Sequence, residues 1–144
     1  MAELTFELVT PEGVKFTEEA YEVLLPTPGG QIGILPHHMP LVTLAVPGVI
    51  GIRRRAEDPD SRIEHFATSG GFVEVDGQRL RLLADTAEHA DDIDELRAQE
   101  ALQRARELHH TAEDHVTLAD ATALIERNTA RLKVAEIRRR HRRS

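Results

Sequence analysis

The sequence predicts an α+β protein in which an N-terminal antiparallel β-sandwich, or flattened barrel, precedes a C-terminal antiparallel two-helix hairpin. Two observations lead to this fold class. Residues 1–88 contain short segments of alternating polarity that recur about every eight to twelve residues between turn signals, which is typical of sandwiches and barrels. In residues 89–144 the apolar residues recur at helical spacing instead. We therefore expect a β domain over 1–88 and a helical domain over 89–144.

The expected strands follow one another along the first domain. Leu4, Phe6 and Leu8 alternate with polar residues and predict a strand that ends at the turn signal of residues 10–13. Further strands are expected at 14–16, 21–25, 32–34, 41–46, 49–52, 63–66, 72–75 and 80–83. The dipeptide Asp76-Gly77 predicts a tight hairpin between the last two, because it tolerates the positive φ that such turns need. No strand–helix–strand alternation is present, so a nucleotide-binding parallel sheet is not expected.

The period changes after residue 90. Asp92, with Glu95 three residues later, predicts the start of a first helix. The polar segment 109–115 is the expected connection, and Thr117 with Asp120 predicts the cap of a second helix that runs to about residue 140. The apolar face of the first helix consists of Ala98, Ala101, Leu102, Ala105 and Leu108. That of the second consists of Leu118, Ala121, Leu124, Ile125, Leu132 and Ala135.

Alanine dominates the two stripes that are expected to meet in this hairpin. An alanine side chain buries about a third of the area of leucine, so at about 25 cal/mol per Å² the seam is weak. A weakly held hairpin opens at little cost, which is what a conformational switch requires. A hairpin that never opens is equally compatible with the composition.

Composition excludes several classes of function. The chain has no cysteine, which rules out disulfides and cysteine-based zinc sites, and its four Phe, one Tyr and no Trp argue against a base-stacking nucleic-acid platform. No apolar segment approaches the roughly 20 residues of a membrane span, and residues 1–4 lack the features of a signal peptide. The sequence contains neither a nucleophile elbow nor a phosphate loop. We expect a soluble, intracellular, non-catalytic protein that does not insert into membranes.

Histidine and arginine are distributed unevenly. His37 and His38 are expected on a strand, where they point to opposite faces, and the other histidines are scattered in polar segments, so no metal site is expected. The C-terminal end is strongly basic, with Arg138, Arg139, Arg140, Arg142 and Arg143 close together. Such a segment is either a solvated helix end or a tail that seeks an acidic partner. Nucleic acid and anionic lipid are the alternative ligands for it.

Three stretches together resemble a known family. They are GQIGILPHHMP at 30–40, SGGFVEV at 69–75, and LADTAE at 83–88 followed by DIDELRA at 92–98. In this order and spacing the chain resembles the epsilon subunits of the rotary, proton-driven F-type ATP synthases, over its whole length. The lack of a transit peptide favours the bacterial or plastid form.

The resemblance implies a non-catalytic subunit of the central stalk. Its head would bind the gamma subunit and the polar loops of the c-ring, and would help to couple proton flow to ATP synthesis. Its helices would extend to reach the alpha and beta subunits and inhibit ATP hydrolysis. The protein would lie peripherally on the cytoplasmic face of the plasma membrane, or on the stromal face of the thylakoid. No cofactor would be required, although ATP could act as a regulator.

The resemblance also implies site residues. An ATP signature, Ile or Leu followed by Asp-x-x-Arg-Ala, falls on 93–98, with one acid before it and arginines after it. The implied ATP set is Glu88, Ile93, Asp94, Arg97, Ala98, Arg104, Arg127 and Arg131. Gln31, His38 and Thr43 match the rotor-facing segment, with glutamine where the family often has an acid. The tail arginines named above would contact the beta subunit.

Two alternatives remain open at this stage. The arginines of the ATP set could instead form ordinary ion pairs with Glu95, Glu100 and Glu126. The protein could also be a stand-alone ATP-sensing module, or a binder of nucleic acid or lipid through its basic tail. Co-purification with a gamma subunit distinguishes a rotor subunit from these alternatives.

Overall fold

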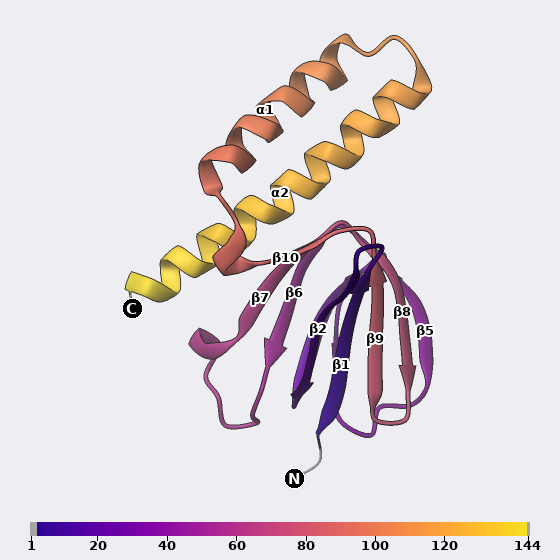
Figure 1. Cartoon of the computed structure of the whole chain (residues 1–144), viewed down its shortest axis with the longest axis vertical. Helices are drawn as coiled ribbons and strands as arrows, with labels where there is room; N and C mark the ends of the chain where they lie inside the picture. The colour runs from indigo at the N-terminus through magenta and orange to yellow at the C-terminus, as the bar shows by residue number, and fades with distance from the viewer. Residues whose placement is uncertain (1–2, 144) are drawn as a thin grey trace.

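The first domain is a sandwich of two five-stranded sheets, as a computed structural model that describes residues 3–143 shows (Figure 1). The β1 sheet contains, in spatial order, β2 (Gly13–Ala20), β1 (Leu4–Thr10), β9 (Arg79–Ala84), β8 (Gly71–Asp76) and β5 (Leu41–Ala45). The β6 sheet contains β10 (Ala87–His89), β7 (Glu64–Thr68), β6 (Gly48–Arg53), β3 (Glu22–Thr27) and β4 (Gly30–Ile34). A 3₁₀ turn, η1 (Asp60–Arg62), precedes β7.

The predicted fold class is confirmed, with two features that the sequence did not predict. β1 and β9 pair in parallel, whereas the other strand pairs of the described chain are antiparallel. A parallel pair needs a long crossover, and here nearly the whole domain provides it. β10 extends the β6 sheet through pairing of Glu88 with Ala67, so the expected domain boundary at residue 88 falls inside a strand.

The sandwich core is made of large aliphatic and aromatic side chains. β1 alternates between buried and half-buried residues along its whole length, as its period-2 pattern predicts. The fully buried side chains of greatest volume are Phe6, Leu4, Leu8, Leu25, Ile34, Ile50, Ile52, Leu80, Leu82, Val23, Val73 and Val75. At Gly71 a β-carbon would lie 1.9 Å from the Leu83 carbonyl oxygen, so only glycine allows β8 and β9 to approach this closely.

Two helices follow a 3₁₀ turn, η2 (Ala90–Asp92). They are α1 (Glu95–Thr111) and α2 (His115–Arg143), so the connection is shorter than expected. The predicted capping residues were wrong. Asp94, not Asp92, caps α1 by accepting a hydrogen bond from the Arg97 amide at 3.1 Å, because Asp92 belongs to the preceding turn. Asp114 does the same for α2, with the Thr117 amide as donor at 2.6 Å.

α2 has two different neighbours along its length. Its N-terminal part packs antiparallel to α1, and its C-terminal part crosses β7 and β6 on the outer face of the β6 sheet (Figure 1). The hairpin therefore projects away from the sandwich, and only the second half of α2 joins the two domains. The outer face of the β1 sheet remains exposed.

Candidate functional site

A charged cluster joins the head to α2. Glu88 on β10 accepts a hydrogen bond from the Nε of Arg131 at 3.2 Å, and its other carboxylate oxygen lies 3.8 Å from an Nη of Arg127. Arg131 also donates through Nη1 to the Oδ1 of the buried Asn128 at 2.8 Å. We call Glu88, Arg127, Asn128 and Arg131 the Glu88 cluster. Its residues come from segments about 40 positions apart, so the cluster exists only while the hairpin is docked.

A small apolar seam supports this cluster. Its buried members, from both domains, are Ala67, Ala90, Ile93, Ala130, Val134 and Ala135, with Val49 at its edge. Ile93 is the only large side chain among the buried members of this described seam. Ile93 therefore anchors the turn that leads from β10 into α1 within this seam.

The remaining members of the expected ATP set do not reach the cluster. Ala98 is fully buried on α1, and Asp94 is used as the helix cap. Arg97 is 82% exposed, with its Nε 3.7 Å from Asp94. Arg104 is exposed on α1. The structure thus brings together Glu88, Arg127 and Arg131, and it leaves Arg97 and Arg104 on the solvent side of α1.

The space beside Glu88 is small. A cavity of about 160 Å³ lies between Lys15, Asp85, Glu88 and Arg127, among other residues of the same edge of the sandwich. Sites for small organic ligands usually measure about 300–1,000 Å³. The Nε of Arg127 is buried and has no hydrogen-bond partner among the described residues, so it is an available donor for an anion.

The basic end of α2 is engaged within the chain. Arg138 donates to the Ala90 carbonyl oxygen at 2.8 Å and lies 3.8 Å from Asp91. Arg139 pairs with Glu95 at 3.2 Å. Within the helix, Arg140 pairs with Glu136 at 2.6 Å. Arg142 and Arg143 belong to α2, but their side chains lie outside the described residues. The alternative expectation paired the arginines of the ATP set with Glu95, Glu100 and Glu126. Instead, Arg97 pairs with Asp94, and Arg127 and Arg131 pair with Glu88.

The three expected rotor-contact residues do not form one patch. Gln31 is near the start of β4 and His38 follows its end, so the two lie at opposite ends of that strand. Thr43 is half-buried on β5, at the edge of the other sheet. His37 and His38 lie in a loop instead of on the strand expected, and His37 has a φ of 66°. No group of three or more potential metal ligands gathers within the described residues.

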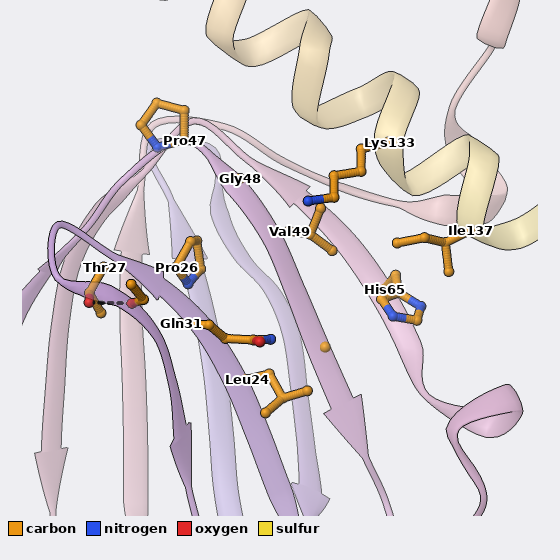
Figure 2. A pocket seen from close by; sticks show the side chains of 12 residues that line it. Leu24, Pro26, Thr27, Gln31, Pro47, Gly48, Val49, His65, Lys133 and Ile137 are labelled. Atoms are coloured by element: carbon orange, nitrogen blue, oxygen red, sulfur yellow. Dashed lines mark hydrogen bonds between the residues drawn. The ribbon is translucent and has the colours of Figure 1, made fainter.

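A larger pocket, of about 390 Å³, lies between the β6 sheet and the end of α2. Figure 2 shows Leu24, Gln31 and His65 contributed by the sandwich, with Lys133 and Ile137 above them on the helix. The lining contains two basic side chains and no acid. Gln31 is thus placed beside the hairpin in this conformation.

Sequence analysis missed an apolar row on the outer face of the β1 sheet. Strand register aligns one residue from each of the five strands, in the order Leu44, Phe72, Leu83, Val9 and Val14. Four of the five are at least 42% exposed, and Val9 is half-buried. A contiguous exposed apolar row of this kind indicates a surface for a protein partner. The pair Phe72-Val73 could have revealed this row. Two successive apolar residues on a strand face opposite sides, so one of them must lie on the outer face of the sheet.

Known proteins match this chain along nearly its whole length. Residues 3–90 match the family model for the β-sandwich domain of the ATP synthase delta/epsilon chain, and residues 91–136 match the model for its long α-helix domain. The chain belongs to the ATP synthase delta/epsilon family. The resemblance stated from the sequence motifs is thereby confirmed.

Relatives agree with this family assignment, and a solved structure shares the fold. The ATP synthase epsilon chain of Herpetosiphon aurantiacus is 40% identical over 137 residues, which cover 94% of this chain and 96% of that one. That of Moorella thermoacetica is 40% identical over 135 residues, covering 94% and 98%. A chain in the Euglena gracilis mitochondrial ATP synthase, solved as OSCP/F1/c-ring, shares the fold with a TM-score of 0.77 at 20% identity, covering 94% and 82%.

Membership of the family makes the protein a stalk subunit rather than a catalytic one. It associates with other ATP synthase subunits in a complex that is peripheral to the membrane. No helix within residues 3–143 is long and apolar enough to cross a membrane.

Proposed function

We propose that this chain, a central-stalk epsilon subunit of ATP synthase by family, couples rotor movement to ATP synthesis through its head and inhibits ATP hydrolysis through its helices. It forms no bonds in the chemistry. The observation that carries this proposal is the contrast between a sandwich with a large core and a hairpin that is docked on it by alanines and ion pairs.

The apolar row is the surface that we assign to the gamma subunit. It crosses all five strands of the β1 sheet, and the hairpin leaves it uncovered. The polar row next to it, which includes Glu7 paired with Arg81 at 3.7 Å, gives the patch a charged border. An apolar centre with a polar rim is the usual composition of protein interfaces. Gln31, His38 and Thr43 remain our candidates for contact with the polar loops of the c-ring.

Inhibition follows from an exchange of partners by the tail arginines. In the docked hairpin Arg138 and Arg139 are held by Asp91, Glu95 and the Ala90 carbonyl. In the extended form they would bind acidic groups of the beta subunit, next to alpha. Because exposed ion pairs contribute only about 0–1 kcal/mol each, the exchange is nearly balanced in free energy.

ATP would bias this exchange toward the docked form. Arg127 and Arg131 form a pair of guanidinium groups next to one carboxylate, and the free Nε of Arg127 is an additional donor. Phosphate oxygens accept bidentate hydrogen bonds from such groups. The cavity of about 160 Å³ is too small for a nucleotide, so ATP binding requires the side chains of Arg127 and Arg131 to turn from Glu88 toward the phosphates while α2 stays on the sandwich. ATP remains a regulator, and no cofactor is required.

The location follows from the assembly. We place the protein on the cytoplasmic face of the plasma membrane, or on the stromal face of the thylakoid in a plastid, where the head would meet the c-ring.

The test of inhibition uses the assembled complex. Arg140, Arg142 and Arg143 are changed together to Gln, which leaves the docking pairs of Arg138 and Arg139 intact. We expect the rate of ATP hydrolysis to rise severalfold, while the subunit still co-purifies with gamma. Deletion of residues 132–144 should have a larger effect of the same sign.

A charge-matched control uses three exposed arginines that lie outside α2, namely Arg55, Arg62 and Arg106 changed to Gln. It should leave hydrolysis unchanged. Equal hydrolysis by all variants would contradict inhibition by the tail, and a failure to co-purify with gamma would contradict the assignment to the central stalk.

The ATP site is tested on the isolated protein by calorimetry. We expect saturable heat at millimolar ATP or below, and Arg127→Gln should weaken binding, whereas Arg106→Gln should not. The absence of heat at millimolar ATP would exclude the site.

A further inference from the structure

The end of α2 meets β7 through two histidine rings. The centroids of His65 and His141 are 5.9 Å apart, and their planes are inclined by 47°. His65 is half-buried under the helix and forms part of the pocket wall (Figure 2), with Ile137 beside it. This contact is located where α2 ends, beyond the apolar seam of Ala130, Val134 and Ala135. Because the pocket of about 390 Å³ adjoins the ring, water and protons reach His65 without any opening of the fold.

Positive groups surround this ring contact. Lys133 of α2 lines the same pocket as His65, and His89 of β10 acts on His65 electrostatically. The last turns of the helix also carry the three cations Arg138, Arg139 and Arg140.

The acidic groups of the neighbouring elements are engaged by other cations. On the sandwich, Glu64 of β7 pairs with Arg54 at 2.6 Å and with His89 at 3.6 Å. Two acids before and at the start of α1 pair with the tail: Asp91 with Arg138 at 3.8 Å, and Glu95 with Arg139 at 3.2 Å. Within α2, Glu136 pairs with Arg140 at 2.6 Å. A proton added to the ring of His65 therefore enters a contact that is already rich in paired cations. The neighbouring cations disfavour that charge, so protonation of His65 weakens the docked contact.

The electrostatics of His65 agree with this geometry. Burial lowers the pKa of His65 from its ordinary value of about 6.5, and His141 and His89 lower it further, while a hydrogen bond to the backbone of Ile63 acts in the opposite direction. The ring is thus uncharged at neutral pH while the helix is docked. When the helix leaves, the pKa of His65 returns toward its ordinary value, so the detached state binds protons more readily. Docking is then strongest above about pH 6.5 and weakens as the pH falls below that value.

We propose that the contact of His65 with His141 is a pH-dependent latch that holds the last turns of α2 on β7 while the ring of His65 is uncharged, and that protonation of His65 releases this end of the helix. The released segment carries Arg138 and Arg139, so opening the latch weakens their contacts with η2 and α1. Mild acidity on the side of the membrane where the subunit lies thereby favours the extended tail. The consequence for ATP hydrolysis rests on the proposed inhibitory function, but the latch itself is a property of the isolated chain.

The test measures the position of the helix end as a function of pH. The chain has no cysteine, so Ser61→Cys and Ser144→Cys place two spin labels without background. Distance distributions are recorded from pH 8 to pH 5.5. We expect the detached population to rise severalfold across this range, because the detached state binds a proton at His65 more readily than the docked state. His65→Gln and His141→Gln should each flatten the profile, and His110→Gln, at the far end of α1, should retain it.

Two further readouts keep the test decisive. Proton NMR should give His65 a pKa below its ordinary value, and His141→Gln should raise that pKa. Circular dichroism of each variant confirms that the head stays folded. A pH profile that persists in His65→Gln, or a pKa of His65 that does not respond to His141→Gln, would overturn the latch. If the tail arginine variants raise hydrolysis while the latch fails, the inference falls and the proposed function stands.

Discussion

The sandwich and the hairpin differ in how each is held together. The interior of the sandwich consists mainly of Leu, Ile, Val and Phe side chains that are almost fully buried, and the eight strand pairs of its two described sheets do not involve α1 or α2. The buried residues of α1 are Ala98, Leu102 and Ala105, and those of α2 are chiefly Ala121, Ala130, Val134 and Ala135. Alanine gains about a third of the burial free energy of leucine.

This difference determines where the molecule can change shape. The hairpin compensates for its thin apolar seam with polar contacts to the head, above all those of Glu88 with Arg131 and of Arg138 with the Ala90 carbonyl. The hydrogen bonds and ion pairs of the hairpin can be replaced by similar bonds to another protein. A buried Leu or Phe side chain would lose its packing if it left the core. The head therefore keeps its conformation, whereas the tail can exchange its contacts with the head for contacts with another protein.

The largest expected effect tests the head. Phe6 is fully buried and its ring centroid is 6.0 Å from that of Phe16. Phe6→Ala should lower the free energy of unfolding by about 3–5 kcal/mol, because it removes a large apolar group and leaves a cavity. Urea denaturation followed by circular dichroism measures the change.

The matched control is Phe72→Ala, in the same sheet but on its exposed face. We expect a loss of under about 1 kcal/mol in the isolated chain together with weaker co-purification with gamma. Equal destabilisation by the two substitutions would contradict the division between core and docking face.

The next largest effect should separate the two domains. Glu88→Gln removes the charge that Arg127 and Arg131 share, and should weaken docking of α2 by about 1–2 kcal/mol. Hydrogen exchange should then accelerate in residues 128–135 and stay unchanged in β1 and β9. Glu100→Gln, an exposed acid on α1, is the control. Accelerated exchange throughout the head would show that the two domains unfold as one unit.

Local sequence patterns predicted the architecture but not the pairings. The alternation of Leu4, Phe6 and Leu8 identified β1, because one face of this strand is buried. β10 was missed because Ala87–His89 is too short to show a period, and its pairing depends on β7, some 20 residues earlier. The cap of α1 was misplaced because several aspartates precede the helix, and only the 3₁₀ turn decides which of them is free to act as a cap.

The candidate site was predictable in its residue types only. The resemblance assigned Glu88, Arg127 and Arg131 to one set, and these three do meet. Their meeting depends on the docking angle of α2, which no local pattern encodes. The same docking leaves Arg97 and Arg104 in solvent, although helical spacing places both on one face of α1. The resemblance assigned Arg138 and Arg139 to contact with the beta subunit in the extended form. In the docked form they pair with Asp91 and Glu95, two acids near the start of α1.

The smallest expected effect concerns the tip of the hairpin, which lies farthest from the sandwich (Figure 1). Asp114 accepts hydrogen bonds from the amide and the hydroxyl of Thr117, and these bonds lower the pKa of its carboxyl below the ordinary value. A lowered pKa means that the cap stabilises α2 at any pH above the ordinary value of about 3.9, and that this contribution is lost as the pH falls through the lower folded value.

Asp114→Ala should therefore fray only the first turn of α2 at neutral pH, seen as faster amide exchange at Val116 and Thr117. Asp120→Ala, one turn further along the exposed face, is the control, because Asp120 was expected to take part in the cap and lies outside it in the structure. The acid-induced fraying of the wild-type tip should be absent in Asp114→Ala, which has already lost the titrating group. If fraying instead spread to Ala130 and the Glu88 cluster, the hairpin would be a single cooperative unit, and detachment would have to begin at its tip rather than at the histidine contact on β7.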